Sequence, residues 1–358
     1  MPRLKLGVIF GGRSQEHEIS IISARAIVAE SDKSRYEVVP LGVSRGGRWL
    51  SPRASERLLA SAPKRCALPP WSKTLGEPFR LLRAVDAAFP VIHGENGEDG
   101  SLQGLLELAG VPYVGAGVAA SALGMDKALQ KEEFIRHGLP TPGFVAFLRR
   151  EWEREPEHCL DAVERELGYP CFVKPANGGS SVGITKAHRR DHLAAGLKEA
   201  ARYDRKLVVE QAIDGRDIEC SVIGNEEAVA ATPLGEITPL REFYDYQAKY
   251  TDSGTRLTVP ADLPPEAAAL LRHYAVQAYR AIDCAGMARV DFLVERGSGR
   301  VFVSEINTVP GFTPISMYAK LWIAAGINFP ALIDWLVKLA LERHANRGGA
   351  KGGPVPEM

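Results

Sequence analysis

Short apolar runs alternate with helix-length stretches through the first third of the chain. Each run has strand composition, and the first ends in Gly11-Gly12 before a helical stretch begins. The expected strands are 4–10, 36–43, 87–92 and 111–114, and the expected helices are 16–30 and one that begins at Ser101. Strands that alternate with helices predict a parallel, doubly wound sheet, in which ligands gather at the carboxyl ends of the strands.

The remainder of the chain is too long to belong to the same core. A chain of 358 residues indicates two or three domains. A second unit is expected to begin near Ala122, and a turn at 213–216 leads into a third. The polar, weakly periodic stretch 45–83 predicts an elaborated surface connection, and the end from Gly348, rich in Gly and Pro, predicts a disordered tail. Further helices are expected over 127–137, 191–203 and 329–344, and further strands over 169–175 and 207–211.

Charge and composition exclude several classes of function. The 44 Lys and Arg residues equal the 44 Asp and Glu residues in number, so no overall field favours nucleic acid or an anionic membrane. The five cysteines are widely spaced without a Cys-x-x-Cys pair, which favours reduced thiols in a cytoplasmic protein. No apolar run approaches ~20 residues, and residues 1–10 enter a strand pattern directly, so we expect neither a membrane span nor a signal peptide.

A pair of strand-like runs near the C-terminus carries opposed carboxylates. Runs 287–295 and 300–307 flank Gly297-Ser298-Gly299, which predicts a short hairpin loop. If that loop has three residues, Asp291 faces Glu305 across the ladder, and Asn307 lies two residues further along the same face. Opposed carboxylates repel, and a hard cation between them, such as Mg²⁺, relieves the repulsion. A solvated hairpin with acidic residues on its wet face fits the pair alone equally well.

A glycine-rich segment, Gly178-Gly179-Ser180-Ser181-Val182-Gly183, follows another predicted strand. Its glycines let backbone N–H groups approach an anion, although the segment alone fits a plain hairpin turn better. Lys174 ends the strand before it, where it suits either phosphates or an ordinary surface position. Glu210 ends the strand 207–211, where it suits an adenine amino group or the cap of a neighbouring turn equally well. Lys127 near a helix start is unremarkable by itself.

An aromatic yet polar segment, 243–250, indicates a loop that folds over a site. Seven ordered segments, one of them in this loop, resemble the D-alanine–D-alanine ligase family of the ATP-grasp superfamily, from Leu4 to about Leu341. The segments are 11–20, 93–100, 124–127, 173–175, 179–183, 244–250 and 305–311. The stretch 45–83 matches poorly and looks like the longer insertion of some members.

The resemblance implies an α/β protein with an ATP-grasp fold in three domains. The expected division is an N-terminal doubly wound parallel-sheet domain (1–121), a central ATP-grasp subdomain (122–213), a C-terminal ATP-grasp subdomain with the metal and substrate sites (214–345), and a tail (346–358). The implied reaction is ATP-dependent ligation of two D-alanines to D-alanyl-D-alanine for peptidoglycan precursors, through an acyl phosphate and a tetrahedral intermediate. A cytoplasmic homodimer without nucleic-acid or membrane partners is expected.

The same resemblance implies roles for individual residues. Nucleotide binding is implied for Lys127, Lys174, Gly179, Ser180, Ser181, Glu210, Ala212, Ile213, Asp217 and Lys249. Two Mg²⁺ or Mn²⁺ ions are implied at Asp291, Glu305 and Asn307. Substrate contacts are implied for Glu16, His93, Lys249, Arg289, Gly311, Ser316 and Met317, and catalytic roles for Glu16, Ser180, Tyr250, Arg289 and the Gly311 N–H. Asp217 stands where many members have a longer Glu on the ribose hydroxyls, so water or a shifted backbone would bridge the gap.

Alternatives differ in the second substrate or in catalysis itself. A D-Ala–D-Ser or D-Ala–D-lactate ligase shares all other parts, and Tyr250 argues against lactate because that activity in related enzymes goes with replacement of its loop segment. A non-catalytic ATP-binding regulator on the same fold would be expected to lack a metal ligand or a phosphate lysine. All of those positions are filled in this chain.

Overall fold

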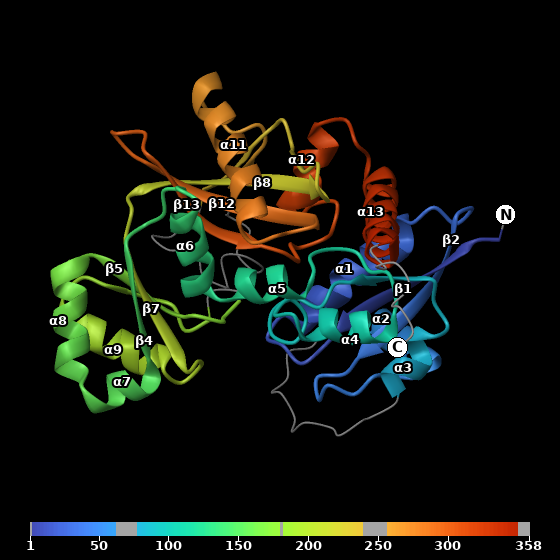
Figure 1. The fold of residues 1–358 in the computed structure, drawn as a ribbon, viewed down its shortest axis with the longest axis horizontal. Helices are drawn as coiled ribbons and strands as arrows, with labels where there is room; N and C mark the ends of the chain where they lie inside the picture. Colours follow the sequence, from blue (N-terminus) through green and yellow to red (C-terminus); the bar gives the residue numbers. More distant parts are fainter. Residues whose placement is uncertain (1, 62–76, 180–181, 239–255, 350–358) are drawn as a thin grey trace, which may run out of the picture.

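Three β-sheets organise the molecule, and each lies in its own part of the fold (Figure 1). The structure is a computed structural model and describes residues 2–61, 77–179, 182–238 and 256–349. In the view of Figure 1 the first sheet lies on the right, a second lies on the left, and the third lies above and between them. Each sheet falls within one of the three predicted segments, while the boundaries between domains stay predictions.

The first sheet is parallel, as the alternation of strands and helices predicts. Its strand order is β2-β1-β3. The central strand β1 is a nearly continuous apolar run because helices cover both faces of a parallel sheet. The predicted strand at 111–114 is reduced to one parallel bridge, between Ala88 and Tyr113. The elements are β1 (Leu4–Gly11), α1 (His17–Glu30), β2 (Tyr36–Val43), β3 (Ala87–Pro90) and α4 (Ser101–Ala109).

The described parts of the stretch 45–83 contain two helices, which the prediction of an elaborated surface connection did not include. They are α2 (Pro52–Ala60) and α3 (Glu77–Leu82). Helix α2 packs on β2, where the buried Ser55 hydroxyl accepts a hydrogen bond from the Gly42 N–H at 2.9 Å. Helices of nine and six residues are shorter than the window over which helical periodicity shows, which explains the missed elements. Residues 62–76 of this stretch lie outside the described residues.

The second sheet is antiparallel, with strand order β4-β7-β5-β6. The glycine-rich segment lies in the connection between the antiparallel strands β5 and β6, and Lys174 lies on β5 just before it. Helices α5 (Val118–Met125) and α6 (Lys127–Arg136) lead into this part. The other elements are β4 (Phe144–Leu148), α7 (Arg149–Arg154), α8 (Pro156–Glu166), β5 (Cys171–Pro175), β6 (Thr185–Ala187), α9 (Arg190–Ala200) and β7 (Lys206–Gln211).

The third sheet has the strand order β11-β10-β8-β12-β13, with β9 paired to β8. Helix α11 packs against it through buried residues such as Leu271, Ala275 and Tyr279, which share a core with the strands. The elements are β8 (Gly215–Gly224), β9 (Val229–Ala230), β10 (Gly235–Thr238), β11 (Arg256–Thr258), α11 (Pro265–Ala281), β12 (Gly286–Glu295) and β13 (Val301–Asn307).

The β12–β13 hairpin confirms the predicted pairing of Asp291 with Glu305. The pairing results from a β-bulge and not from the three-residue loop on which the prediction was based. Val294 pairs with Val301, a register that on its own would place Asp291 opposite Ser304. A bulge shifts the register between Asp291 and Phe292 and passes over Ser304. The loop is therefore longer than predicted, and the bulge restores the opposition of the two carboxylates.

The last two helices, α12 (Met317–Ala324) and α13 (Phe329–Gly349), return to the first sheet. Leu332 and Leu336 of α13 belong to the same hydrophobic cluster as Leu6 and Phe89 of the first sheet. Helix α13 continues past its predicted end at His344, because no helix-breaking residue precedes the Gly348-Gly349 pair. The chain thus closes its first core with its last helix.

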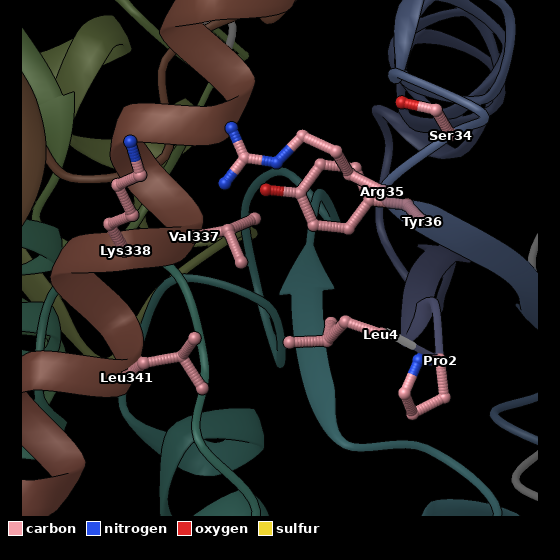
Figure 2. A pocket seen from close by; sticks show the side chains of 8 residues that line it. All are labelled: Pro2, Leu4, Ser34, Arg35, Tyr36, Val337, Lys338 and Leu341. Atoms are coloured by element: carbon pink, nitrogen blue, oxygen red, sulfur yellow. The ribbon is translucent and has the colours of Figure 1, made fainter.

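A small surface cavity of about 360 Å³ marks the junction between α13 and the start of the first sheet (Figure 2). Figure 2 shows the side chains of Arg35 and Tyr36 directed toward α13. The Asp334 carboxylate of α13 accepts a hydrogen bond from the Tyr36 hydroxyl at 2.6 Å and pairs with Arg35 at 2.8 Å and Lys338 at 2.9 Å. We call these four side chains the Asp334 cluster.

Two general expectations concern membranes and thiols. No single helix within the described ranges is long and apolar enough to cross a membrane, and one bent pair, Met317–Ala324 with Phe329–Asn346, meets the length and composition requirement only across a 105° break. The four cysteines in the described ranges are free thiols and buried, namely Cys159, Cys171, Cys220 and Cys284.

Candidate active site

A cavity of about 590 Å³ brings together strand residues of the second and third sheets with residues that follow β1 and β3 of the first sheet. Most of the described residues predicted for the site line it. They are Glu16, His93, Lys127, Lys174, Gly179, Asp217, Arg289, Asp291, Glu305, Asn307, Gly311, Ser316 and Met317. Segments up to 300 positions apart in sequence therefore face one space, as a binding site between domains requires.

Glu16 lies just before α1, with its carboxylate enclosed by two glycines from other segments. A Cβ atom on Gly179 would lie 2.6 Å from Glu16 Oε2, and one on Gly94 would lie 3.1 Å away. Gly94 also has φ +76°, a conformation that other residues rarely adopt. The loop that follows β3 and the glycine-rich segment therefore both close on Glu16, and only glycine leaves room for its carboxylate.

His93 is buried and joins two loops of the cavity wall. Its Nδ1 lies 2.9 Å from the Val309 carbonyl, which can only accept, so Nδ1 carries the proton. Its Nε2 then accepts from the Ser23 hydroxyl at 3.0 Å, and Ser23 Oγ accepts from the Phe312 N–H at 3.4 Å. Burial lowers the pKa of His93, which favours this neutral form. The ring thereby fixes the segment 309–312, which contains Gly311.

Lys127 contacts the first glycine of the glycine-rich segment, and two further lysines lie beside Glu210. Lys127 Nζ donates to the Gly178 carbonyl at 2.6 Å. Lys174 Nζ donates to Glu210 Oε2 at 2.7 Å, and Lys131 Nζ lies 3.6 Å from Glu210 Oε1. Burial opposes the charge on Glu210, but the ammonium groups of Lys131 and Lys174 outweigh it and lower the pKa of Glu210. The three ammonium groups outnumber the Glu210 carboxylate to which two of them bind, which suits phosphates.

A row of carboxylates crosses the third sheet on the face of the cavity. Asp291 on β12 is opposite Glu219 of β8 on one side and Glu305 of β13 on the other. Arg289 donates to both oxygens of Asp291, at 2.7 Å and 2.6 Å, and lies 3.2 Å from Glu219. Burial opposes the charge of Arg289, yet Asp291 and Glu219 outweigh it and raise its pKa well above the ordinary value. Arg289 therefore bridges two carboxylates of the row, Asp291 and Glu219.

The donor set of Asp291, Glu305 and Asn307 fits a hard divalent cation, because all three supply oxygen. In the part of the chain that the structure describes, no group of three or more His, Cys, Asp or Glu side chains is arranged to hold a metal ion. The predicted set has two carboxylates and one amide, so it falls outside such a group. A cation bound to Asp291 would compete with Arg289 for the same two oxygens.

Glu98 is a buried acid that the sequence analysis left without a role. Its Oε1 accepts from the Gly94 N–H at 2.6 Å, and its Oε2 is buried without a hydrogen-bond partner among the described residues. Burial, followed by the charge of Glu16, raises the pKa of Glu98 to about 8. Glu98 is thus a neutral acid on the cavity wall beside Glu16.

Several predicted residues lie elsewhere. Glu210, Ala212 and Ile213 do not line this cavity, and the Ala212 N–H donates to the Pro170 carbonyl at 3.1 Å. The loop 243–250 and four predicted site residues lie outside the described residues, so their placement stays a prediction. They are Ser180, Ser181, Lys249 and Tyr250.

Glu219, Glu98 and Lys131 are charged residues that the sequence analysis missed. Glu219 had a signal, because it lies two residues after Asp217 on a strand and therefore on the same face. Glu98 lies inside the segment 93–100, whose charge pattern resembles a solvated loop. Lys131 looks like any helix lysine until its burial is known.

Comparison with known families decides which family the chain belongs to. The family described as D-ala D-ala ligase N-terminus matches residues 5–116, and the one described as D-ala D-ala ligase C-terminus matches residues 134–338. The chain belongs to the D-alanine–D-alanine ligase family. Both parts of the cavity wall, the Glu16 side and the carboxylate row, lie within the matched ranges.

Individual members of the family are similar over nearly their whole length. The D-alanine–D-alanine ligase of Heliobacterium modesticaldum is 48% identical, covering 97% of each chain, and that of Acetivibrio thermocellus is 44% identical, covering 94% of this chain and 96% of the relative. The solved D-alanine–D-alanine ligase of Coxiella burnetii has a TM-score of 0.80 at 34% identity, covering 98% of this chain and 97% of that one. The solved VanG D-Ala:D-Ser ligase of Enterococcus faecalis also has a TM-score of 0.80 at 34% identity, covering 95% and 100%. The expected ATP-grasp fold of the ligase family is confirmed.

Proposed function

We propose that this chain joins two D-alanine molecules to D-alanyl-D-alanine at the expense of ATP, releasing ADP and phosphate. The observation that carries the proposal is the single cavity in which anion-binding lysines, a carboxylate row and Glu16 face one another. Membership of the ligase family agrees with it, as do full-length relatives named D-alanine–D-alanine ligase.

The nucleotide occupies the side of the cavity formed by the second sheet. We assign the phosphates to Lys127, Lys174 and the glycine-rich segment from Gly179 through Ser180 and Ser181. Glu210 and the backbone of Ala212 and Ile213 take the adenine, and Asp217 takes the ribose. Lys174 already lies against Glu210, so the adenine and phosphate ends of the site are linked by an ion pair at 2.7 Å.

Asp291, Glu305 and Asn307 would hold the divalent ions, which we assign as two Mg²⁺ or Mn²⁺. When bound, such ions neutralise charge on the transferring phosphoryl group. Arg289 must then release part of Asp291, and its guanidinium becomes available for the acyl centre. Glu219 remains its partner at 3.2 Å and keeps it in the cavity.

The first D-alanine lies near Glu16, and its carboxylate oxygen attacks the γ-phosphorus as ADP leaves. Glu16 binds the ammonium group of this D-alanine, and His93 holds the segment that contains Gly311. The product is an acyl phosphate, which hydrolyses readily. Closure of the cavity therefore has to exclude water, and we assign that role to the loop 243–250.

The second D-alanine loses a proton, and its amine attacks the acyl carbon as phosphate leaves. Arg289 and the Gly311 N–H stabilise the oxyanion of the tetrahedral intermediate. Ser316 and Lys249 hold the carboxylate of the incoming molecule, and Met317 packs beside it. The proton goes to Tyr250 or to a water chain through Ser180.

A coupled assay of ADP release tests the proposal, with D-Ala, L-Ala, D-Ser and D-lactate as separate second substrates. Of these four compounds, we expect only D-Ala to support ADP release, with D-alanyl-D-alanine as the product. The solved D-Ala:D-Ser ligase matches this fold as well as the D-Ala–D-Ala ligase of Coxiella burnetii does, so the D-Ser arm is a real alternative. If ADP release requires D-Ser, D-Ser is the second substrate. If none of the four compounds supports ADP release, the proposed ligase activity is wrong. That the protein is a cytoplasmic homodimer stays a prediction. Sedimentation of the purified chain measures its oligomeric state.

A further inference from the structure

The strand that carries Glu305 and Asn307 is at the edge of the third sheet. On one side β13 pairs with β12. On its outer side its backbone is met by the segment 127–141 instead of a strand. The Val303 N–H donates to the Pro140 carbonyl at 2.7 Å. Residues of α6 satisfy the next groups along the edge, so this edge is covered by helix side chains.

Both peptide groups that flank Glu305 are bound by consecutive residues of α6. Lys131 Nζ donates to the Ser304 carbonyl at 2.9 Å, which belongs to the peptide group before Glu305. Gln130 Oε1 accepts from the Ile306 N–H at 2.9 Å, which belongs to the peptide group after Glu305. Two bonds on the two sides of one Cα atom restrict the backbone rotation that would turn the Glu305 side chain.

The two α6 side chains are fixed themselves. Lys131 is 1% exposed; its Nζ donates to Thr141 Oγ1 at 3.3 Å in addition to Ser304, and forms an ion pair with Glu210 Oε1 at 3.6 Å. Gln130 is 2% exposed, and its Nε2 donates to the Gly124 carbonyl at 3.2 Å. A buried ammonium is costly unless its hydrogen bonds are satisfied, so this arrangement holds one geometry.

The bulge at Ser304 makes such a restraint necessary. Without the bulge Asp291 would face Ser304, and Glu305 would point to the other face of the sheet. The hairpin register alone therefore does not decide where Glu305 points. The bonds from Lys131 and Gln130 hold the peptide groups next to the bulge in the arrangement that turns Glu305 toward Asp291.

We propose that Lys131 and Gln130 are positioning residues that hold Glu305, through the peptide groups on its two sides, in the orientation that binds a divalent cation. This inference rests on the metal role of Glu305 in the proposed function. Lys131 also contacts Glu210, on the adenine side, so it links the two ends of the nucleotide site. Gln130 bonds to the Ile306 N–H and the Gly124 carbonyl and, within the described residues, has no bond to Glu210, which makes the two residues separable.

Calorimetric titration of ADP with and without Mg²⁺ tests the inference on the full chain. The dissociation constant of ADP without Mg²⁺, divided by the one with Mg²⁺, measures the metal-dependent gain in affinity. This ratio leaves out the part of the affinity that comes from binding of the adenine. Outer residues that orient metal ligands are typically worth about 10–100-fold in metal affinity, so we expect Lys131→Met and Gln130→Met each to lower the ratio by about tenfold. For Gln130→Met the metal-free dissociation constant should stay within about twofold of wild type, far below that effect.

Three variants serve as controls. Gln130→Glu keeps the acceptor for the Ile306 N–H and should keep the metal-dependent gain. Lys198→Met removes an exposed lysine of α9 and should change nothing. Glu305→Gln removes the ligand itself and should abolish the gain. If Lys131→Met does not fold, Gln130→Met alone decides the matter.

The possible outcomes distinguish a failure of this inference from a failure of the proposed function on which it rests. A gain that is lost in Glu305→Gln but intact in both Met variants overturns the positioning role and leaves the proposed function standing. If both Met variants lose the same factor of ADP affinity with and without Mg²⁺, the positioning role is also wrong, because both residues would then affect binding of the adenine. A gain intact in Glu305→Gln itself removes the metal role of Glu305, and the inference with it.

Discussion

The Asp334 cluster and the carboxylate row are two groups of charged side chains with opposite composition. At the Asp334 cluster one carboxylate has three donors, and its cationic partners Arg35 and Lys338 are 48% and 61% exposed. In the row one guanidinium serves Asp291 and Glu219, with Glu305 next to them, and the Arg289 side chain is only 15% exposed. A carboxylate with three donors fastens a helix to a sheet, whereas a row of carboxylates on a cavity wall is an arrangement to which a cationic ligand can bind.

Glu305→Gln should show the largest difference between the carboxylate row and the Asp334 cluster. The substitution keeps the shape and removes one charge, so we expect turnover to fall by about 10²-fold or more while the melting temperature stays within about 2 °C. Coupled ADP release and thermal unfolding measure the two effects. Glu295→Gln, at the exposed end of the same hairpin, is the matched control and should leave turnover unchanged. Parallel losses of turnover and stability in Glu305→Gln would make Glu305 a structural residue.

Glu98 should give the protein a pH dependence of stability that Asp334 does not. The pKa of Glu98 is raised to about 8 from 4.5, so between these values the folded chain holds a proton that the unfolded chain lacks. Stability is then fully present below pH 4.5 and falls as pH rises toward 8, by up to about 1.4 kcal/mol per pH unit. Glu98→Gln should flatten this fall in chemical unfolding at pH 5.5 and 8, and Glu95→Gln, at an exposed position, should not. A wild-type curve flat over this range would rule out a neutral Glu98.

Asp334→Asn should cost stability without a loss of activity. It weakens three interactions of a carboxylate that is 14% exposed, so we expect the free energy of unfolding to fall by about 1–2 kcal/mol. Lys338, Tyr36 and Arg35 lower the pKa of Asp334 against the effect of burial, so its contribution is complete above pH 3.8 and is lost only in acid. The cost of the substitution should therefore be the same at pH 5.5 and 8. A cost that changes between these pH values would contradict a charged Asp334.

Arg35→Gln should have the smallest effect. Arg35 is about half exposed and Asp334 keeps its bonds to Tyr36 and Lys338, so a loss of about 0.2–1 kcal/mol is expected. Unfolding at low and high salt measures it, and high salt should shrink the difference between variant and wild type. A difference that persists in high salt would mean that Arg35 acts by packing against the Tyr36 ring, whose centroid lies 5.9 Å away.

The sequence predicts the elements that extend over many residues and the site residues that lie at strand ends. Strand β1, helix α1 and helix α6 were predicted within two residues. The boundaries of two of them are marked locally, because β1 is a nearly continuous apolar run and α6 begins directly after Asp126, whose side chain caps it. The opposition of Asp291 and Glu305 was predicted correctly from a hairpin loop of the wrong length, since a bulge compensated for it. Bulges and buried lysines depend on groups distant in sequence, so neither Ser304 nor Lys131 could be recognised from local pattern.

The return of α13 to the first sheet has a consequence for how the chain is made. Leu332 and Leu336 complete a hydrophobic cluster that begins with Leu6, more than 320 positions earlier. During synthesis the first sheet emerges from the ribosome long before the helix that covers it, and its apolar face stays accessible to water in the meantime. Contacts this distant in sequence also slow folding. A nascent chain without its last helix should therefore be the state of this protein that most needs a chaperone.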